Sequence, residues 1–497
     1  MNYKMIGYVL GRIFLVEAGL LTLPLAVALL YGEFATLPGF LVPLVLLTLI
    51  GLALGLRTPK DTAIFAREGL VVVALSWVLM SLFAAMPFTI SGEIPSFIDA
   101  FFEMVSGFTT TGSTILTDIE ALSKGLLFWR SLSHWVGGMG VLVFTMAVLP
   151  MSDGRAMHLM RAEVPGPSVG KLSSKLRDTA KILYALYFVL TMIETVLLML
   201  GGVSLYDALI TSFGTAGTGG FSNYALSIGA FDSAYVEIVV TVFMLLFGIN
   251  FNLYYFLLLR RFKEVFRSEE LITYLIVVGV STMAIAANVF SLYGSVSQSL
   301  RYAGFQVVSI ITTTGYATAD FNLWPTFSKT VLMLLMFFGG CAGSTAGGLK
   351  MARIIIMFKA SMQDIQRVLH PHAVTTVRFE GKPLEEKTVR GVHVYLTIFI
   401  LIMGISTLLI SFDEWDVITS FTAVVTCLNN VGPGLELVGP MGGFAQFSPF
   451  AKMVLTFDML VGRLEIFPML VLISPSLWVK GRRKHGHVSE RKRARVD

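Results

Sequence analysis

The chain contains 497 residues, of which 55% are hydrophobic and 14% are charged, and its formal net charge is +5 at pH 7. Soluble domains contain about 25% charged residues, so this composition excludes an ordinary soluble protein. The two cysteines, Cys341 and Cys427, lie far apart in apolar surroundings, which argues against a disulfide framework and a zinc site.

About ten apolar segments are long enough to cross the ~30 Å hydrocarbon layer of a bilayer. In chain order they lie near residues 7–31, 38–56, 70–91, 127–149, 181–201, 235–259, 270–292, 328–358, 391–411 and 450–479. The first contains Glu17 and is followed at once by the second, so we interpret it as a retained helix and not as a signal peptide. The sequence therefore predicts an all-α polytopic membrane protein.

Lysine and arginine are concentrated in the loops that follow even-numbered crossings and in the C-terminal tail. By contrast, residues 202–234 and 412–449 contain no lysine or arginine. This alternation is the positive-inside pattern, and it predicts that both termini are cytoplasmic. Because the positive charge is explained as a topology signal of a protein in a lipid bilayer, it does not indicate a nucleic-acid partner.

Four further segments, at about 96–115, 204–222, 297–317 and 414–434, do not fit as crossings. Each begins with a short amphipathic stretch and ends in small, hydroxyl-bearing and glycine residues, which is typical of a re-entrant loop. The ends read TTTGST (109–114), GTGGFS (217–222), TTTGYA (312–317) and NNVGPG (429–434). Their central glycines are predicted to be Gly112, Gly219, Gly315 and Gly432, separated by 107, 96 and 117 residues.

These segments define an internal repeat of helix, re-entrant loop and helix. The predicted units are an N-terminal helix pair (1–66), pore repeat 1 (67–160), pore repeat 2 (161–265), pore repeat 3 with an intramembrane glycine-rich loop (266–375), pore repeat 4 (376–480) and a basic cytoplasmic tail (481–497). Each repeat has an even number of crossings, so all the repeats have the same orientation and their loops meet on one side of the membrane.

Loops in like orientation can be arranged around an axis, where their carbonyl oxygens replace the hydration shell of a cation. Glycine suits this role because it adopts positive φ without steric cost, and irregular backbone at membrane depth is tolerated where it lines a cavity. The short helices direct their partially negative C-terminal ends toward the centre, which favours a cation over an anion. The candidate cation-binding residues are Thr111, Gly112, Thr218, Gly219, Gly220, Thr314, Gly315, Val431 and Gly432.

The stretches GFTTTGST, GTGGFS, TTTGYATADF and CLNNVGPGL, with GGCAGSTAGGLK and GRLEIF, resemble the TrkH-type subunit of the Trk/Ktr/HKT potassium transporters over almost the whole chain. The resemblance implies a pseudo-fourfold pore of four M1–P–M2 units, a homodimer in the bacterial inner membrane, and a cytoplasmic nucleotide-binding partner of the TrkA type. It also implies that K⁺ is the transported ion, that no organic cofactor binds this chain, and that the four central glycines belong to the filter. Glycine at all four positions favours K⁺, because serine in the first loop accompanies Na⁺ permeation in some relatives.

The third inner segment, near 328–358, is too long for a simple crossing, and residues 339–348 read GGCAGSTAGG. At 1.5 Å per residue, about twelve preceding helical residues place this stretch near the middle of the bilayer. We expect the glycines to interrupt the helix, and the hydroxyl groups beside them to satisfy the freed backbone groups. With support from the resemblance, we hypothesise an intramembrane gate beneath the filter, formed by Gly343, Ser344, Thr345, Gly347 and Gly348. A close-packing glycine seam between helices is the alternative.

Arg463 lies about thirteen residues into the last inner segment, where a charge is costly and usually faces a cavity or a partner. We interpret it as part of the gate, facing the ion pathway, where it repels cations and touches the glycine-rich stretch. The alternative is an ion pair with Glu17, Glu194 or another buried acid. Asn250 and His134 are expected to make interhelical or packing contacts.

A secondary carrier with broken helices is the closest alternative function, but such folds commonly use inverted repeats, whereas these repeats are parallel. Coupling to Na⁺ or H⁺ stays open. An enzyme would need convergent acid, base, nucleophile or metal ligands, and the chain contains no HExxH, GxSxG or paired acidic motif. We therefore expect a transport protein with no catalytic residues, and a purely structural scaffold is the weakest interpretation.

Overall fold

The computed structural model of the chain describes residues 1–61, 64–140, 176–371 and 376–474. The predicted basic tail 481–497 lies outside the described residues. Two short strands, β1 (Arg378–Phe379) and β2 (Lys382–Pro383), pair as an antiparallel hairpin. Short 3-10 helices occupy connecting loops: η1 (Phe34–Thr36), η2 (Ser227–Phe231), η3 (Phe321–Leu323), η4 (Ser411–Asp413) and η5 (Glu436–Val438).

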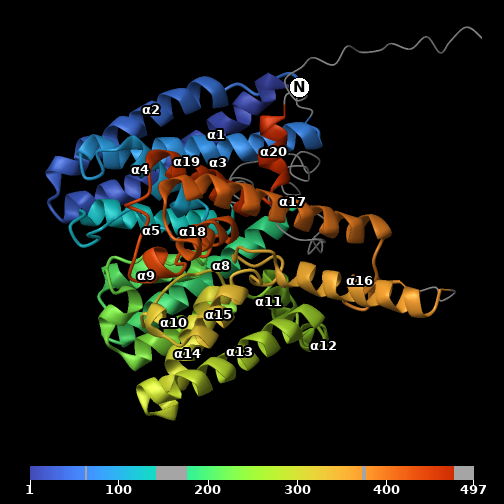
Figure 1. Cartoon of the computed structure of the whole chain (residues 1–497). Helices are drawn as coiled ribbons and strands as arrows, with labels where there is room; N and C mark the ends of the chain where they lie inside the picture. The colour runs from blue at the N-terminus through green and yellow to red at the C-terminus, as the bar shows by residue number, and fades with distance from the viewer. Residues whose placement is uncertain (62–63, 141–175, 372–375, 475–497) are drawn as a thin grey trace, which may run out of the picture.

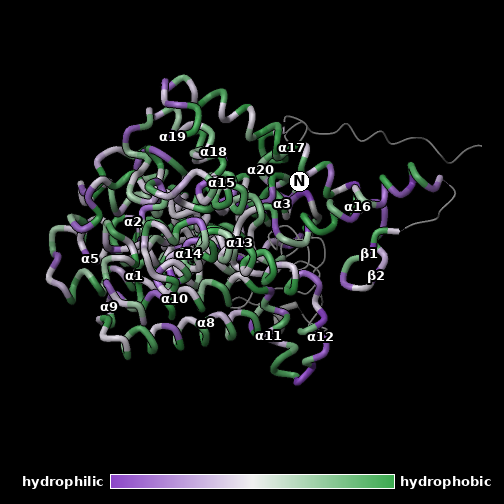
Figure 2. Tube along the Cα trace, turned by 60° about the horizontal axis from the view of Figure 1, so that its bottom comes forward, coloured by the Kyte–Doolittle hydropathy of each residue, from purple (hydrophilic) through white to green (hydrophobic). Residues whose placement is uncertain are grey.

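In the described part of the chain, six helices are long and apolar enough to cross a membrane without interruption. They are α1 (Tyr3–Leu30), α2 (Leu37–Gly55), α3 (Ala66–Ser91), α8 (Leu176–Leu200), α13 (Glu269–Tyr293) and α17 (Glu386–Ile410). Each coincides with an apolar segment predicted from the sequence, and Figure 2 shows hydrophobic residues over much of the helical body. The predicted all-α polytopic membrane fold is confirmed.

Four shorter helices precede the glycine-containing loops, namely α4 (Phe97–Phe108), α9 (Leu205–Gly217), α14 (Val296–Ile311) and α18 (Val417–Asn429). They contain 12, 13, 16 and 13 residues, which is too few to cross a bilayer. Ser96, Ser204 and Asp416 cap α4, α9 and α18, each accepting a hydrogen bond from the N–H group three residues further on. These helices match the starts of the four segments predicted to be re-entrant.

The segment after each loop begins as a helix that stops before it could span a membrane. These inner helices are α5 (Lys124–Gly138), α10 (Ala234–Phe247), α15 (Thr326–Leu335) and α19 (Pro449–Arg463). After α10 the chain bends by 92° into α11 (Phe251–Leu258), which short α12 (Phe262–Phe266) follows. After α15 it runs irregularly to α16 (Met351–Leu369), and after α19 it resumes as α20 (Phe467–Ile473).

The expected interruption of the third inner segment is therefore confirmed, and the helices in the segments at 235–259 and 450–479 are also interrupted, which was not predicted from the sequence. The α10–α11 break occurs because the Gly248 carbonyl accepts from the Cys341 N–H group (2.9 Å) instead of continuing a helix. Asn250 then caps α11 by accepting from the Asn252 N–H group (2.9 Å), so its main role is local and not the predicted interhelical bond. The part of segment 127–149 beyond residue 140 lies outside the described residues.

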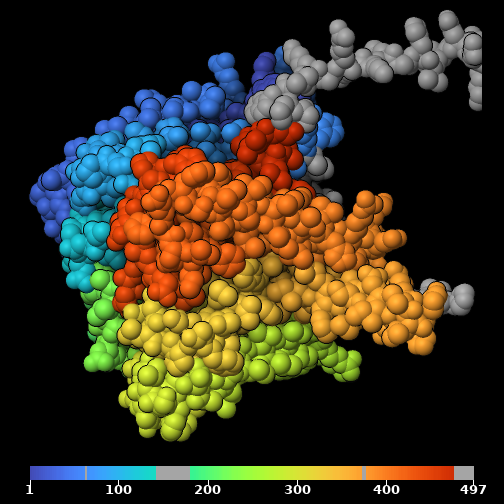
Figure 3. All heavy atoms as spheres, viewed as in Figure 1, coloured from blue at the N-terminus to red at the C-terminus, as the bar shows by residue number. Residues whose placement is uncertain are grey.

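Three of the four short helices pack against the inner helix of the preceding repeat. Helix α5 packs on α9, α10 packs on α14, and α19 of the last repeat packs on α4 of the first, which brings the first and last repeats together. The N-terminal pair α1 and α2 packs against α3 and α5 of the first repeat. Figures 1 and 3 show α16 and the adjoining end of α17 projecting from the helical body.

Candidate cation site

All four short helices end in the same unusual backbone conformation. The residues just after them, Thr110, Thr218, Thr313 and Asn430, have φ of 54°, 54°, 57° and 54°, the left-handed region. Two residues further on, Gly112, Gly220, Gly315 and Gly432 have φ of 82°, 75°, 79° and 101°. A side chain is disfavoured at these φ values, so glycine is required where the loops turn.

This comparison corrects the predicted register of the second loop. The glycine equivalent to Gly112 is Gly220, and Gly219 occupies the position of Thr111. Thr218 is correspondingly equivalent to Thr110 and not to Thr111, as the shared left-handed φ shows. The sequence AGTGG (216–220) contains two adjacent glycines after Thr218, so spacing alone could not distinguish Gly219 from Gly220 as the equivalent of Gly112.

The four loops contact each other in a closed ring through these glycines. A Cβ atom on Gly112 would lie 2.0 Å from the carbonyl oxygen of Gly219, and one on Gly220 would lie 1.9 Å from that of Thr314. Likewise, a Cβ on Gly315 would lie 2.3 Å from the carbonyl oxygen of Val431, and one on Gly432 would lie 2.8 Å from that of Thr111. Each loop thus places a carbonyl beside the glycine of its neighbour, in the order 1–2–3–4–1. We call Gly112, Gly220, Gly315 and Gly432, with the preceding carbonyls, the glycine ring.

Buried hydroxyl and amide groups hold the glycine ring from behind. The Thr109 and Thr111 hydroxyls are 2.8 Å apart, and the equivalent hydroxyls of Thr312 and Thr314 are also 2.8 Å apart. Loops 1 and 4 are joined directly, because the Asn430 amide donates to the Thr111 hydroxyl (2.9 Å). These bonds fix the side chains of Thr111 and Thr314, whose backbone carbonyls belong to the ring.

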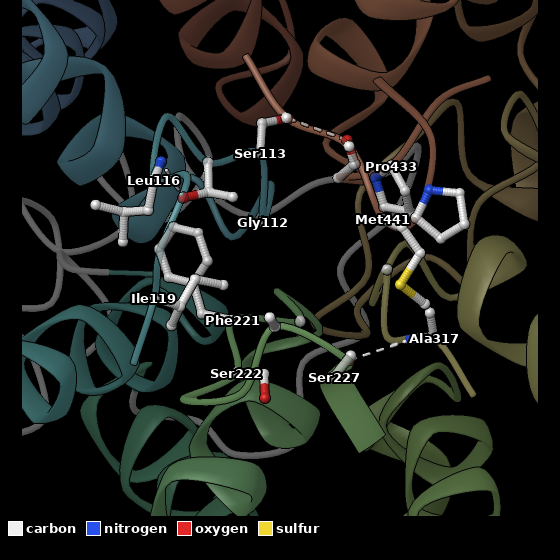
Figure 4. A pocket seen from close by; sticks show the side chains of 18 of the residues that line it. Gly112, Ser113, Leu116, Ile119, Phe221, Ser222, Ser227, Ala317, Pro433 and Met441 are labelled. Carbon is white, nitrogen blue, oxygen red and sulfur yellow. Dashed lines mark hydrogen bonds between the residues drawn. The ribbon is translucent and has the colours of Figure 1, made fainter. Parts of the chain in front are cut away.

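A cavity of about 120 Å³ opens above the glycine ring and is lined by all four of its glycines. Figure 4 shows Gly112 and Ser113 on one side of this opening, facing Pro433 and Met441, with Phe221, Ser222 and Ser227 on another side. Two dashed bonds join neighbouring loops there: Ser113 Oγ donates to the Gly432 carbonyl (3.1 Å), and the Ala317 N–H group donates to Ser227 Oγ (3.2 Å). The cavity is therefore built from the same loops as the ring.

The charged side chain Arg130 of α5 also lines this cavity, and it is paired with Glu103 of α4. Arg130 Nε donates to Glu103 Oε1 at 2.6 Å, and both side chains are at most 1% exposed. The carboxylate additionally accepts from the Thr114 hydroxyl and the Ile115 N–H group, each at 2.9 Å. The pair therefore fixes loop 1 to α4 and neutralises a positive charge beside the cavity.

His134 of α5 lies behind the first two loops, where it is completely buried. Its Nδ1 is 2.8 Å from the Gly107 carbonyl of α4, and its ring lies 4.1 Å from the Phe221 ring. A Cβ on Gly219 would lie 2.4 Å from the same Nδ1, so the ring of His134 supports the backbone of loop 2. The predicted packing role of this histidine is confirmed.

The predicted glycine-rich stretch, residues 339–348, lies directly against the glycine ring. The Gly347 N–H group donates to the Thr313 hydroxyl at 2.6 Å, and a Cβ on Gly347 would lie 2.7 Å from the Asn429 carbonyl. Ser344 and Thr345 satisfy freed backbone groups, as expected: their hydroxyls donate to the carbonyls of Cys341 (2.6 Å) and Phe247 (3.2 Å). We call residues 339–348 the glycine-rich segment.

Arg463, at the end of α19, contacts the glycine-rich segment, as expected. Its guanidinium donates to the Thr345 carbonyl at 2.9 Å and to the carbonyls of Gly137 and Gly138 at 2.6 and 2.8 Å. Among the described residues, the ion pairs do not include one between Arg463 and Glu17 or Glu194. Arg463 thus joins the ends of α5 and α19 to the third inner segment.

Two acidic residues near the glycine-rich segment carry contacts that the sequence did not predict. Glu465 forms an ion pair with Arg353 of α16, and Glu270 of α13 accepts hydrogen bonds from two backbone N–H groups around the segment. The sequence did contain an indication of the Arg353–Glu465 pair, because charged residues within apolar membrane segments usually pair with a residue of opposite charge. No pattern in the sequence brings positions 270 and 342 together.

The fold and site define an all-α polytopic membrane protein with four parallel helix–loop–helix repeats around one axis. Residues 40–480 match the TrkH family, which is described as a cation transport protein family. The chain belongs to this family, and family membership supports the expectation that it is not an enzyme.

Individual relatives match over nearly the full chain. The Trk system potassium uptake protein TrkH of Escherichia coli K12 is 36% identical over 96% of this chain and 100% of its own length. TrkG of the same strain, also named a Trk system potassium uptake protein, is 35% identical over 92% of this chain and 94% of its own. The crystal structure of the potassium transporter TrkH from Vibrio parahaemolyticus covers 96% of this chain and all of that one, with a TM-score of 0.85 at 31% identity.

Proposed function

We propose that this chain is the potassium-conducting subunit of a bacterial Trk-type uptake system. The observation that carries the proposal is the closed glycine ring, in which each loop presents a carbonyl oxygen beside the glycine of the next. The names of the relatives, which are potassium uptake proteins, support K⁺ as the ion.

In this proposal the glycine ring is the selectivity filter. The backbone carbonyls of Thr111, Gly219, Thr314 and Val431 replace the hydration shell of K⁺, as carbonyl rings do in potassium channels. Glycine at the next position lets the backbones approach closely enough for all four carbonyls to contribute. Thr218 and Gly220 belong to the same site, Gly220 as the ring glycine and Thr218 as the residue that ends α9.

The electrostatics beside the filter favour a cation. The C-terminal ends of α4, α9, α14 and α18 all precede the ring, so their partial negative charges converge on it. The positive charge of Arg130 at the cavity is compensated by Glu103 at 2.6 Å. A cation entering the cavity therefore meets carbonyl dipoles and a neutralised guanidinium.

The proposed gate consists of the glycine-rich segment, including Gly343, Ser344, Thr345, Gly347 and Gly348, together with Arg463. Its support is the contact of Gly347 with loop 3 and the bond from Arg463 to the Thr345 carbonyl. A positive charge beneath the filter repels cations, and the segment blocks the path until it is displaced. Deleting residues 343–347 should raise cation leak, whereas unchanged flux would rule out this gate.

The remaining features of the proposal concern assembly and topology. We assign both termini and the α16 side to the cytoplasm of a bacterial inner-membrane protein, with the repeat boundaries 67–160, 161–265, 266–375 and 376–480. A homodimer is supported by an exposed apolar stripe on α16, made of Phe358, Met362, Ile365 and Leu369. A TrkA-type nucleotide-binding subunit is proposed as the cytoplasmic partner, because the relatives are named as parts of a Trk system.

The test of this function is ⁸⁶Rb⁺ flux into liposomes that contain the purified chain, with K⁺ and Na⁺ as competitors and Gly315→Asp in parallel. We expect K⁺ to suppress the flux, Na⁺ not to suppress it, and the substitution to abolish it. Flux that is indifferent to Gly315 would overturn the filter assignment. Flux that requires a Na⁺ or H⁺ gradient would instead establish the alternative, a coupled symporter of the same family.

A further inference from the structure

We propose that Glu270 is a positioning residue for the glycine-rich segment, and that the β1–β2 hairpin acts on this segment through Glu270. This inference deepens the proposed gate and rests on it. It concerns residues at the start of α13 and on the hairpin, none of which contacts the glycine ring.

A single carboxylate oxygen of Glu270 holds both ends of the connection between the glycine-rich segment and α16. Glu270 Oε1 accepts from the Ala342 N–H group at 2.7 Å and from the Ala352 N–H group at 3.0 Å. Ala342 lies within the segment, and Ala352 lies in the first turn of α16, where N–H groups have no partner inside the helix. These two hydrogen bonds restrain the segment and the start of α16 at two points.

Burial makes these hydrogen bonds important. The Glu270 side chain is 5% exposed, and a buried carboxyl group is costly unless it is hydrogen-bonded. If the segment moved away, the Ala342 bond would break and the carboxylate would lose one of its two backbone partners. Glu270 therefore favours the observed position of the segment over any displaced one.

The hairpin contacts the same residue from the other side. Glu380 lies at the hairpin turn, and its Oε1 accepts from the Glu270 N–H group at 3.1 Å and from the Ser268 hydroxyl at 2.9 Å. Ser268 is the N-cap of α13, so the Glu380 carboxylate also interacts favourably with the positive end of that helix. Glu380 thus holds the backbone of Glu270 while the side chain of Glu270 holds the segment.

A second set of contacts joins the hairpin to α16. Lys359 of α16 forms an ion pair with Glu269 and donates to the Arg378 carbonyl at 2.9 Å. Phe379 of the hairpin is 8% exposed and belongs to one apolar cluster with Ile356 of α16. We call Ser268, Glu269, Glu270, Lys359, Arg378 and Glu380 the clasp. Because the clasp is a continuous set of bonds, a force on the hairpin reaches the segment through discrete contacts.

Helix α16 also reaches the other component of the proposed gate. Arg353, in its first turn, forms an ion pair with Glu465, two residues after Arg463. The Arg353 guanidinium lies 4.2 Å from the ring centre of Tyr395 on α17. A displacement of α16 that opened the clasp would therefore also act on the break at the end of α19. The hairpin and α16 are therefore connected to both components of the proposed gate.

The native cysteine Cys341 supplies a direct measurement of segment position. It lies beside Ala342 and is completely buried. We would use the full chain with Cys427→Ser, so that Cys341 is the single thiol, and measure its modification by a methanethiosulfonate reagent in liposomes alongside ⁸⁶Rb⁺ flux. The variants are Glu270→Ala, Glu270→Gln and Glu380→Gln, with Glu264→Gln on exposed α12 as the matched control.

We expect Glu270→Ala to raise the Cys341 modification rate by at least about tenfold, a factor that corresponds to about 1.4 kcal/mol, and to raise flux with it. Glu270→Gln keeps an acceptor oxygen for the two N–H groups and should change the rate by less than Glu270→Ala. Glu380→Gln should shift both readouts in the same direction, and Glu264→Gln should shift neither. A general loss of folding would not produce this graded order of effects among the variants, whereas a positioning role of Glu270 would.

Two outcomes distinguish failure of this inference from failure of the proposed gate. If Cys341 stays protected in Glu270→Ala while deletion of 343–347 raises flux, the gate stands and the clasp is overturned. If Cys341 becomes accessible but flux does not change, the clasp holds the segment and the segment is not the gate. Equal effects of Glu270→Ala and Glu264→Gln on modification would also overturn the clasp.

Discussion

The guanidinium group of Arg463 donates a hydrogen bond of 2.9 Å to the carbonyl oxygen of Thr345. This bond joins the end of the fourth inner helix to the glycine-rich segment of the third. A hydrogen bond with one charged partner contributes about 1.5–3 kcal/mol, and about 1.4 kcal/mol is a tenfold change in an equilibrium. The bond is therefore strong enough to bias the segment toward the observed position.

Replacing Arg463 by alanine should increase ⁸⁶Rb⁺ flux by about tenfold or more, because it removes the bond to Thr345 and the positive charge beneath the glycine ring. Arg463→Lys keeps the positive charge but replaces the two donating nitrogens of the guanidinium with one ammonium group. Its flux should therefore lie between that of the wild type and that of Arg463→Ala. The measurement is liposome flux normalised to folded protein. Wild-type or lower flux in a well-folded Arg463→Ala protein would contradict the gating role.

The corrected register of loop 2 predicts that Gly220 is as essential as Gly112. A Cβ on Gly220 would lie 1.9 Å from the Thr314 carbonyl, and its φ of 75° disfavours any side chain, so Gly220→Ala should abolish selective flux. Gly391→Ala on α17 is the matched control, because a Cβ there would meet no atom within 4 Å. Normal K⁺ selectivity in Gly220→Ala would show that the loops do not form the conducting ring.

The buried pair Glu103–Arg130 should be critical for stability. Breaking a buried ion pair leaves an uncompensated charge and typically costs about 3–5 kcal/mol, so Arg130→Met should strongly lower the free energy of unfolding. Glu436→Gln breaks the more exposed Lys329–Glu436 pair, whose atoms are 3.8 Å apart, and should cost about 1 kcal/mol or less. Denaturant unfolding in detergent micelles would compare the two, and similar losses would argue against a structural role for Glu103–Arg130.

His134 should support selectivity through packing. Its removal in His134→Ala leaves a cavity behind Gly219 and should lower stability by about 2–5 kcal/mol, as large-to-small core substitutions do. Discrimination of K⁺ over Na⁺ should fall with it, because loop 2 loses its support. His134→Asn retains a donor for the Gly107 carbonyl and should preserve more of the selectivity. The ratio of K⁺ to Na⁺ competition against ⁸⁶Rb⁺ measures this, and an unchanged ratio in His134→Ala would contradict the prediction.

Much of the fold could be predicted from the sequence, because long apolar segments indicate membrane-spanning helices and short amphipathic segments indicate re-entrant ones. The positions of α4, α9, α14 and α18 and the interruption at 339–348 follow from length and glycine content. The breaks after α10 and α19 were missed because single glycines are common within membrane helices. Asn250 and Pro468 were weak local signals for the helices that restart there, since asparagine caps helices and proline favours the first turn.

The candidate site was less predictable, because its geometry comes from contacts between distant loops. Two adjacent glycines in loop 2 made Gly219 and Gly220 equivalent by spacing, and only the φ pattern separates them. The bond from Asn430 to Thr111 joins residues 319 positions apart, and the Glu270 contacts span 72 and 82 positions. Such pairings depend on how the repeats pack, which periodicity within one segment does not encode.

The most direct test of the central claim is to locate the ion. Crystals of the purified chain grown in Rb⁺ salt, measured at the rubidium absorption edge, would show bound Rb⁺ as a stand-in for K⁺ by its anomalous signal. The account predicts a peak on the axis of the glycine ring, coordinated by the carbonyl oxygens of Thr111, Gly219, Thr314 and Val431, that disappears when Na⁺ replaces Rb⁺. Absence of a peak at the ring, or a peak only elsewhere in the protein, would contradict it.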